Sequence, residues 1–185
     1  MRLFPAFFLC LLLAGCGRGA PFHMTDISGG SPQLDFHLRR ASDGAAVTGQ
    51  DYRGKVVALY FGYTHCPDIC PTTLSNLTDV AKRAGPDFQI LFVTVDPGRD
   101  TREVLNQYAH AFTPQMDGLY GSANQLAEAA RRYRVAYSVK PGPPYDVMHS
   151  NAVFFFDRDG KARLVTTDTS DSAAIAQDVR RLLAG

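Results

Sequence analysis

Residues 55–71 read KVVALYFGYTHCPDICP, and this stretch decides the fold. Residues 55–63 form a continuous apolar run, which is typical of a strand buried on both faces of a sheet. Pro67 and Pro71 come next, and proline suits the first turn of a helix because its missing N–H would have no partner there. The stretch therefore predicts a central strand that leads directly into a helix.

A second apolar run, FQILFVTV at residues 88–95, predicts another buried strand. Between the two runs, apolar residues recur at helical spacing, at Leu74, Leu77, Ala81 and Ala84. A strand–helix–strand unit of this kind predicts a parallel pair of strands with a right-handed crossover.

The rest of the chain continues the alternation of strands and helices. Capping-box patterns predict that two helices begin at Asp100 and at Ser122. Residues 151–166 predict a terminal β-hairpin, and an amphipathic helix follows it. Since neither an internal repeat nor a second domain is evident, we expect one α/β domain over residues 34–185, with a central mixed sheet flanked by helices.

The composition excludes several classes of protein. The chain has 185 residues with a net charge of +1, which leaves no basic excess for nucleic acid. Four cysteines are too few for a disulfide scaffold in a chain of this length. They divide into Cys10 and Cys16 near the N-terminus and the pair Cys66 and Cys70.

The first sixteen residues predict export. Arg2 precedes an apolar run at residues 3–14, which is shorter than the about 20 residues of a membrane-spanning helix. Residues 13–16, LAGC, resemble the bacterial lipobox, whose cysteine becomes the lipidated first residue of the mature protein. We expect residues 1–15 to be a signal peptide, and Cys16 to anchor the protein on the periplasmic side of the cell membrane. An ordinary cleaved signal with a chance cysteine is the alternative.

Residues 17–33 are rich in glycine, proline, serine and polar residues without periodicity. We therefore predict that residues 16–33 are a lipidated N-terminus followed by a flexible linker, with ends about 20–25 Å apart. His23 and Met24 within this segment are interpreted as spacer residues without a role in metal binding.

Cys66 and Cys70 fall where the first buried strand ends and the next helix begins. The N–H groups and partial positive charge of a helix N-terminus favour the thiolate, the form that attacks disulfides and binds metals. At positions i and i+4 of a helix the Cβ atoms are about 5–6 Å apart, whereas a disulfide needs about 3.5–4.5 Å. The spacing favours a metal site, with a reversible disulfide, a structural disulfide or inert buried thiols as alternatives.

Two thiolates leave a soft metal in need of a third ligand, and His149 is the candidate among five histidines. The alternative is that it is a loop histidine without a role in metal binding. It follows a loop rich in proline and glycine and lies just before the strand predicted to begin at Asn151. If that strand neighbours the one ending at Tyr63, both loops meet at one edge of the sheet. His65, in contrast, must point away from Cys66 in an extended backbone.

Three segments together resemble the signature of the Sco/SenC family: YFGYTHCPDICP at residues 60–71, VDPGRDT at residues 95–101, and the segment from Tyr145 to His149 and Ser150. Members of this family are thioredoxin-fold copper-binding proteins that help to assemble the binuclear copper site of cytochrome c oxidase. The match runs from about residue 34 to residue 183, with the order and spacing of the segments preserved.

The resemblance implies a thioredoxin-like fold and a copper ion, as Cu(I), Cu(II) or both, held by Cys66, Cys70 and His149. The softness of the donor atoms agrees with copper as the ion, because thiolates suit Cu(I) and an added imidazole also accommodates Cu(II). The implied partner is the copper-site subunit of cytochrome c oxidase. Other periplasmic copper carriers or thiol reductants are further expected partners.

Two positions depart from the family pattern. Met148 stands where an acidic residue commonly precedes the histidine, so weaker Cu(II) binding and a preference for Cu(I) are expected. The alternative is that this methionine packs against Phe61 or Phe154. Gly98 stands where the family often has glutamate. Asp68, between the cysteines, is interpreted as a residue near the metal, a docking residue or an exposed helix charge.

The leading interpretation is a non-enzymatic copper metallochaperone that holds one copper ion and passes it on by ligand exchange. The second is a thiol–disulfide oxidoreductase that uses Cys66 and Cys70 to reduce the cysteines of the oxidase copper site. The third is a copper or redox sensor. His149 separates these interpretations, because metal binding needs it and disulfide exchange does not. Zinc is an alternative metal for a set of two cysteines and one histidine.

Overall fold

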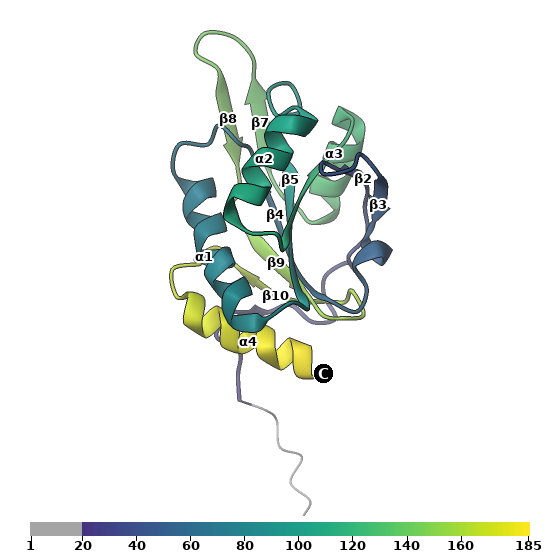
Figure 1. Cartoon of the computed structure of the whole chain (residues 1–185), viewed down its shortest axis with the longest axis vertical. Coiled ribbons are helices and arrows are strands. Elements are labelled where there is room, and N and C mark those ends of the chain that lie inside the picture. Colours follow the sequence, from purple (N-terminus) through teal and green to yellow (C-terminus); the bar gives the residue numbers. More distant parts are fainter. Residues whose placement is uncertain (1–19) are drawn as a thin grey trace, which may run out of the picture.

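The computed structural model describes residues 20–185, which form an eight-stranded sheet, a two-stranded sheet and four α-helices (Figure 1). The strands are β1 (Thr25–Asp26), β2 (His37–Arg40), β3 (Ala46–Thr48), β4 (Val56–Gly62), β5 (Phe88–Thr94), β6 (Met116–Tyr120), β7 (Tyr137–Lys140), β8 (Asp146–His149), β9 (Val153–Phe156) and β10 (Ala162–Thr166). The helices are α1 (Ile69–Ala84), α2 (Arg102–Phe112), α3 (Ala123–Arg132) and α4 (Ser172–Ala184), and a 3₁₀ helix spans Gly49–Tyr52. None of these helices has both the length and the apolar character needed to cross a membrane.

The centre of the large sheet is the parallel pair that the two apolar runs predict. Strands β4 and β5 pair in register from Val56 with Phe88 to Gly62 with Thr94, and α1 makes the crossover between them. Every residue of both strands is buried, which explains why neither run shows the alternation of a half-exposed strand. The strand order is β1-β10-β9-β4-β5-β6-β2-β3, with parallel and antiparallel neighbours, so the predicted mixed sheet is confirmed.

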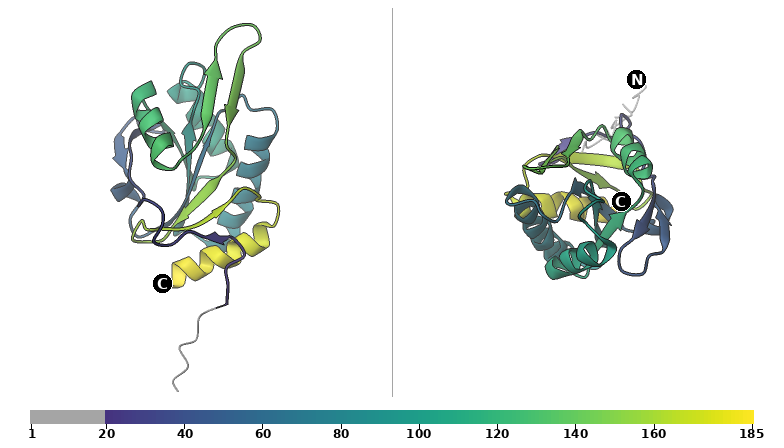
Figure 2. Two further views of the ribbon diagram at one scale, coloured as in Figure 1. Left: turned by 180° about the vertical axis from the view of Figure 1, so that it is seen from behind. Right: turned by 90° about the horizontal axis from the view of Figure 1, so that it is seen from above.

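Helices cover both faces of this sheet. Helices α1 and α2 lie on one face and α3 lies on the other, as the view from above shows (Figure 2). Side chains of β4 reflect this alternation, since Tyr60 contacts Cys70 of α1 whereas Phe61 packs near Tyr133, which follows α3. Helix α4 packs beside α1 at the end of the molecule opposite the β7–β8 hairpin (Figure 1).

The predicted terminal hairpin is confirmed as β9 and β10, which pair antiparallel. Strand β9 also pairs antiparallel with β4, with Val153 opposite Tyr60. The chain just before β9 therefore reaches the carboxyl end of β4, where Cys66 and Cys70 follow.

A second hairpin, β7 with β8, has no counterpart in the sequence prediction. Its strands have four residues each, are mostly half-exposed and flank a loop rich in proline and glycine, so they carry no strong strand pattern. His149 pairs with Tyr137 as the last residue of β8. The expected loop histidine is thus a strand residue.

One of the two predicted helix starts is wrong by a residue. Thr101, not Asp100, caps α2, and its side chain accepts a hydrogen bond from the N–H of Val104. Asp100 is instead buried and bonds to the loop before α1. The capping box predicted at Ser122 and Gln125 is present at the start of α3.

Residues 20–27, which we call the N-terminal strap, lie against the domain rather than forming the free linker that their composition predicts. Thr25 and Asp26 form β1 on the edge of β10, and Met24 is buried. Phe22 and Ile27 pack partly against the core as well. These apolar residues are too widely spaced to give a periodic pattern, yet burying them holds the segment in place.

Candidate metal site

Cys66 and Cys70 occupy the turn between β4 and α1, as predicted. Cys66 lies in the loop and Cys70 in the first turn of α1, with side chains 8% and 0% exposed. The N–H of Cys70 donates to Sγ of Cys66 at 3.4 Å, and both thiols are free. The helix terminus therefore turns the two sulfurs toward one another.

His149 reaches the same place from the β7–β8 hairpin. Its Nε2 lies 3.3 Å from Sγ of Cys70. Its Nδ1 lies 2.9 Å from the carbonyl oxygen of Ser150, so Nδ1 carries the proton and donates it there. Nε2 then presents its lone pair to the sulfurs, which is the form that binds a metal.

The ligand atoms of Cys66, Cys70 and His149 all lie within 4.8 Å of one another. A metal bonded to sulfur at about 2.3 Å bridges donors up to about 4.6 Å apart, so the cluster needs little adjustment to hold one ion. Two thiolates and an imidazole are soft and intermediate donors, a set that suits copper and also zinc. The residues present fit a metal ion.

In the absence of a metal ion, burial determines the protonation states of Cys70 and His149 in the cluster. Desolvation raises the pKa of the Cys70 thiol to about 12. The prediction that the helix N-terminus favours its thiolate is therefore wrong for metal-free Cys70, because desolvation outweighs the helix and the hydrogen bonds. Desolvation also lowers the pKa of His149, which keeps the imidazole neutral. Metal binding must then displace the Cys70 proton.

Aromatic residues of β4 and the following turn surround the cluster. The Tyr60 hydroxyl donates to Sγ of Cys70 at 3.6 Å. The rings of Tyr60 and Tyr63 lie edge-on to His149, with centroids 6.0 and 5.7 Å away. These contacts exclude water from the sulfur atoms and fix the plane of the imidazole.

Gly62 leaves the room that the Cys70 thiol occupies. A Cβ at this position would lie 2.7 Å from Sγ of Cys70 and 2.8 Å from the ring of Phe92. Such distances are too short for non-bonded contacts, so only glycine fits the last residue of β4.

Asp100 fastens the cysteine loop to the end of β5. Its carboxylate is buried and accepts from the N–H of Thr64 at 3.0 Å and from the Thr64 hydroxyl at 2.6 Å. It also accepts from the Thr94 hydroxyl at 2.7 Å. Charge-assisted bonds of this kind are about twice as strong as neutral ones, so the loop before Cys66 is held firmly.

Asp96 and Arg99 fasten the histidine hairpin to the same strand end. The Tyr145 hydroxyl, at the start of the hairpin's second arm, donates to Oδ1 of the buried Asp96 at 2.7 Å. Arg99 pairs with Asp96 at 2.5 Å and lies 3.8 Å from the centroid of the Tyr145 ring. It also lies 5.7 Å from the centroid of Tyr63, which contacts His149. We call Asp96, Arg99 and Tyr145 the clasp.

The sequence prediction gave Asp96 and Tyr145 no individual role and gave Asp100 only that of a helix cap. A signal for the two carboxylates was present, because they follow a buried strand that is the parallel neighbour of the cysteine strand. Tyr145 stood at the start of one of the segments that carry the resemblance, but its contact with Asp96 could not be predicted, because it depends on how the unpredicted β7–β8 hairpin folds.

The other singled-out residues lie outside the cluster. His65 is 3.0 Å from the Thr64 hydroxyl and 3.5 Å from Asp100 through Nδ1, which agrees with its predicted turn away from Cys66. Asp68 precedes α1 without a side-chain capping bond. Met148 is 59% exposed, so the expectation that it packs against Phe61 or Phe154 is wrong. Its neighbour His149 occupies the inward-facing position of the strand.

Comparison with known proteins identifies this architecture. The family model described as SCO1/SenC matches residues 28–184. The human "Protein SCO2 homolog, mitochondrial" is 39% identical over 160 residues, which cover 82% of this chain and 60% of that protein. The chain thus spans about three fifths of the length of this relative.

Solved structures agree in fold. A copper-bound ScoI structure from Arabidopsis thaliana has a TM-score of 0.76 at 32% identity, covering 82% of this chain and 98% of that one. A more distant structure, BsSco with a disulfide switch, is described as a member of the Sco family of cytochrome c oxidase assembly proteins. It has a TM-score of 0.64 at 23% identity, covering 83% of this chain and 97% of that one.

The fold and the Cys–Cys–His cluster define a copper-binding protein with a thioredoxin-like domain. The chain belongs to the SCO1/SenC family. Proteins of this family bind copper and act in cytochrome c oxidase assembly.

The first prediction concerns Gly62. We expect Gly62→Ala to lower the free energy of unfolding by about 1–3 kcal/mol, because the added methyl group overpacks the site. It should also weaken copper binding by displacing Sγ of Cys70. Urea denaturation and a copper titration measure both effects. The control is Gly98→Ala, whose added Cβ meets nothing closer than 3.8 Å. Equal behaviour of the two variants would contradict the steric argument.

The second prediction concerns thiol reactivity. In the reduced, metal-free chain at pH 8, iodoacetamide should modify Cys66 before Cys70, because Cys70 is fully buried with a pKa of about 12. Peptide mass spectrometry over a time course measures the order. In denaturant the two cysteines should react at similar rates. Faster modification of Cys70 than of Cys66 in the native chain would contradict the protection of Cys70 by burial.

The third prediction concerns the clasp. Tyr145→Phe should accelerate amide hydrogen exchange across β7 and β8 about 10–100-fold, because it removes a hydrogen bond to a charged group worth about 1.5–3 kcal/mol. Exchange followed by NMR measures it. Tyr137→Phe is the control, since it removes a hydroxyl from the same hairpin without touching Asp96. Unchanged protection in Tyr145→Phe would show that the clasp does not hold the hairpin.

Proposed function

We propose that this protein is a copper metallochaperone that binds one copper ion through Cys66, Cys70 and His149 and helps to assemble the binuclear copper site of cytochrome c oxidase. The observation that carries the proposal is the meeting of three donor atoms within 4.8 Å at the carboxyl end of β4. Membership of the SCO1/SenC family supports copper as the ion rather than zinc.

The geometry suits the capture and release of an ion. Cys70 is fully buried at the start of α1, whereas His149 is half-buried at the end of a hairpin. A receiving protein can therefore replace the imidazole first and then compete for the sulfurs, which is ligand exchange. Because the Cys70 proton leaves when the ion binds, it must return to the thiol when the ion departs.

A second function is favoured by a separate observation. The two thiols are free and adjacent, and Cys66 is the more exposed of them. As a thiolate, Cys66 could attack a partner's disulfide to form a mixed disulfide, which Cys70 would then resolve. The products are a Cys66–Cys70 disulfide and two reduced partner thiols. Disulfide exchange makes no use of His149, whose Nε2 lies beside the Cys70 sulfur, so we rank the thiol reductase below the metallochaperone. A copper or redox sensor is the third candidate.

The proposal includes a place in the cell. Cys16 lies outside the described residues, and its lipobox context supports a lipid-anchored protein on the periplasmic side of the membrane, after removal of residues 1–15. There the copper-site subunit of the oxidase is the receiving partner. Other periplasmic copper carriers and thiol reductants are candidate donors of copper and electrons.

The fourth prediction tests the ligand set. Titration of the reduced domain with Cu(I) and Cu(II) should show one ion per chain with thiolate charge-transfer absorption in the Cu(II) form. His149→Ala should abolish Cu(II) binding and retain weakened Cu(I) binding to the two thiolates.

The matched control is His65→Ala, which removes the histidine next to Cys66 that lies outside the cluster and should bind as the natural chain does. Binding that survives Cys66→Ser at full strength would refute the metallochaperone. Oxidase assembly that survives His149→Ala, with thiol reductase activity intact, would favour the reductase.

The fifth prediction concerns Met148. Met148→Asp should raise Cu(II) affinity relative to Cu(I), because a carboxylate beside His149 adds negative charge near the more highly charged ion. Competition titrations measure the two affinities, with Met148→Asn as the uncharged control. If the ratio of affinities is the same in all three proteins, residue 148 does not select the oxidation state.

A further inference from the structure

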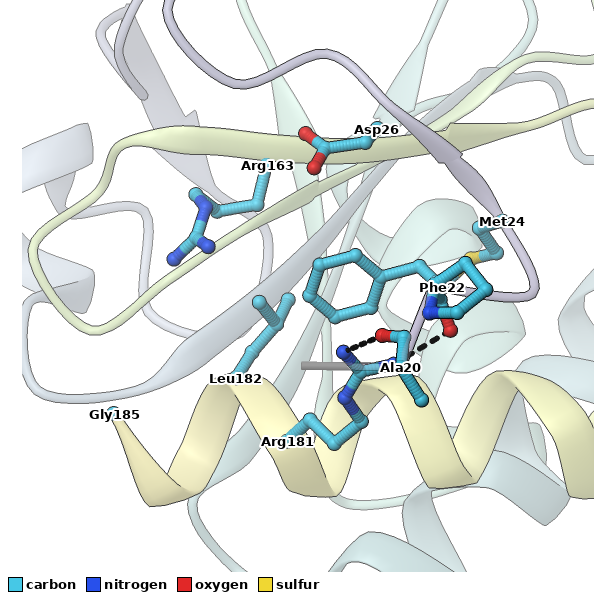
Figure 3. A pocket seen from close by; sticks show the side chains of 9 residues that line it. Ala20, Phe22, Met24, Asp26, Arg163, Arg181, Leu182 and Gly185 are labelled. Carbon is cyan, nitrogen blue, oxygen red and sulfur yellow. Dashed lines mark hydrogen bonds between the residues drawn. The ribbon is translucent and has the colours of Figure 1, made fainter. Parts of the chain in front are cut away.

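The N-terminal strap begins on α4, where one arginine holds it (Figure 3). Arg181 donates hydrogen bonds to the carbonyl oxygens of Ala20 and Pro21, the latter at 2.9 Å. Its guanidinium also lies 3.9 Å from the centroid of the Phe22 ring. The first described residues of the chain are therefore fixed to the last helix.

The strap is then anchored in the core. The N–H of Met24 donates at 2.9 Å to Oδ2 of Asp178, a fully buried carboxylate on α4. Removing the strap would leave this carboxylate without its backbone donor. The loss in folding free energy would be well above that from losing a surface contact, because the charge stays buried. Pairing of Thr25 and Asp26 with β10 follows. The strap is thus a built part of the domain.

The strap starts at the end of the molecule away from the metal cluster. Cys70 lies in the first turn of α1, and the carbonyl of Arg83 in its last turn accepts from Arg180 of α4 at 3.3 Å. Helix α1 has 16 residues and is about 24 Å long. Figure 1 and the left view of Figure 2 agree that α4 and the β7–β8 hairpin lie at opposite ends.

A fixed strap shortens the connection to Cys16. Whatever its conformation, the chain from residue 16 to residue 20 reaches at most about 14 Å. The flexible linker that composition predicts would instead separate its ends by about 20–25 Å and let the domain turn freely. A lipid at Cys16 therefore brings the strap and α4 close to the membrane surface.

The surface there suits a lipid–water interface. A cavity of about 750 Å³ opens between the strap and α4 (Figure 3). Phe22, Met24 and Leu182 line it together with the charged residues Asp26, Arg163 and Arg181. Apolar side chains beside guanidinium groups are the combination that settles at the boundary between acyl chains and phosphate headgroups.

We propose that the strap orients the domain on its membrane, with the face made by the strap and α4 toward the phospholipid headgroups and the metal cluster at the far end of α1. The inference rests on the lipid anchor at Cys16 from the proposed function. In this orientation the cluster faces partners that project from the bilayer, rather than the lipid surface itself.

The chain has no tryptophan, so a single introduced one reports its own distance from the membrane. Arg180→Trp marks α4, and Lys140→Trp marks the β7–β8 hairpin at an exposed position outside the metal cluster. Each lipidated full chain is reconstituted in phosphatidylcholine vesicles that carry a dansyl-labelled headgroup lipid. Energy transfer should be severalfold greater from Arg180→Trp than from Lys140→Trp.

Releasing the strap with Phe22→Ala and Arg181→Ala together should bring the two transfer efficiencies close to one another. Arg131→Ala on α3, away from the strap, should leave their ratio unchanged. A copper titration of the same vesicles shows whether each chain is folded and binds copper, and this result does not depend on the energy transfer. Equal transfer from both positions in chains that bind copper overturns the orientation alone. A mass spectrum showing no lipid at Cys16 overturns both the proposed anchor and the orientation, and leaves the proposed copper binding standing. Loss of copper binding in the unreleased chains overturns the proposed function.

Discussion

The contact between Sγ of Cys70 and Nε2 of His149 joins two side chains from distant parts of the sequence, and the site depends on it. Cys70 arrives on the first turn of α1, directly after the central strand β4. His149 arrives at the end of β8, beside the start of β9, which pairs with β4 in the opposite direction. The carboxyl end of β4 is the place in the sheet where both connections meet.

The end of the neighbouring strand β5 keeps the two halves of the site together. Asp100 holds the loop before Cys66, and Asp96 with Arg99 holds the hairpin through Tyr145. Buried carboxylates are costly unless they are fully bonded, and both have several donors. The segment that follows β5 therefore serves the metal site without contributing a ligand atom to the cluster.

The sequence predicted the buried framework, and the resemblance named the three residues whose donor atoms the structure brings together. Strands β4 and β5 carry long apolar runs that only a doubly covered position explains, and the cysteines follow one of them directly. Short elements escaped prediction: β7 and β8 are too brief and too exposed to show a period. The strap escaped because its few apolar residues lie among glycines and polar residues, and only the surfaces of α4 and β10 give them somewhere to pack.

The proposed function depends on a copper ion held between Cys66, Cys70 and His149. X-ray absorption spectroscopy of the chain loaded with one equivalent of copper tests it most directly, because the scattering separates sulfur from nitrogen neighbours. We expect two sulfur ligands and one imidazole nitrogen per copper in the natural chain, with the nitrogen lost in His149→Ala. A first shell made only of oxygen and nitrogen, or an imidazole signal that persists in His149→Ala, would contradict it.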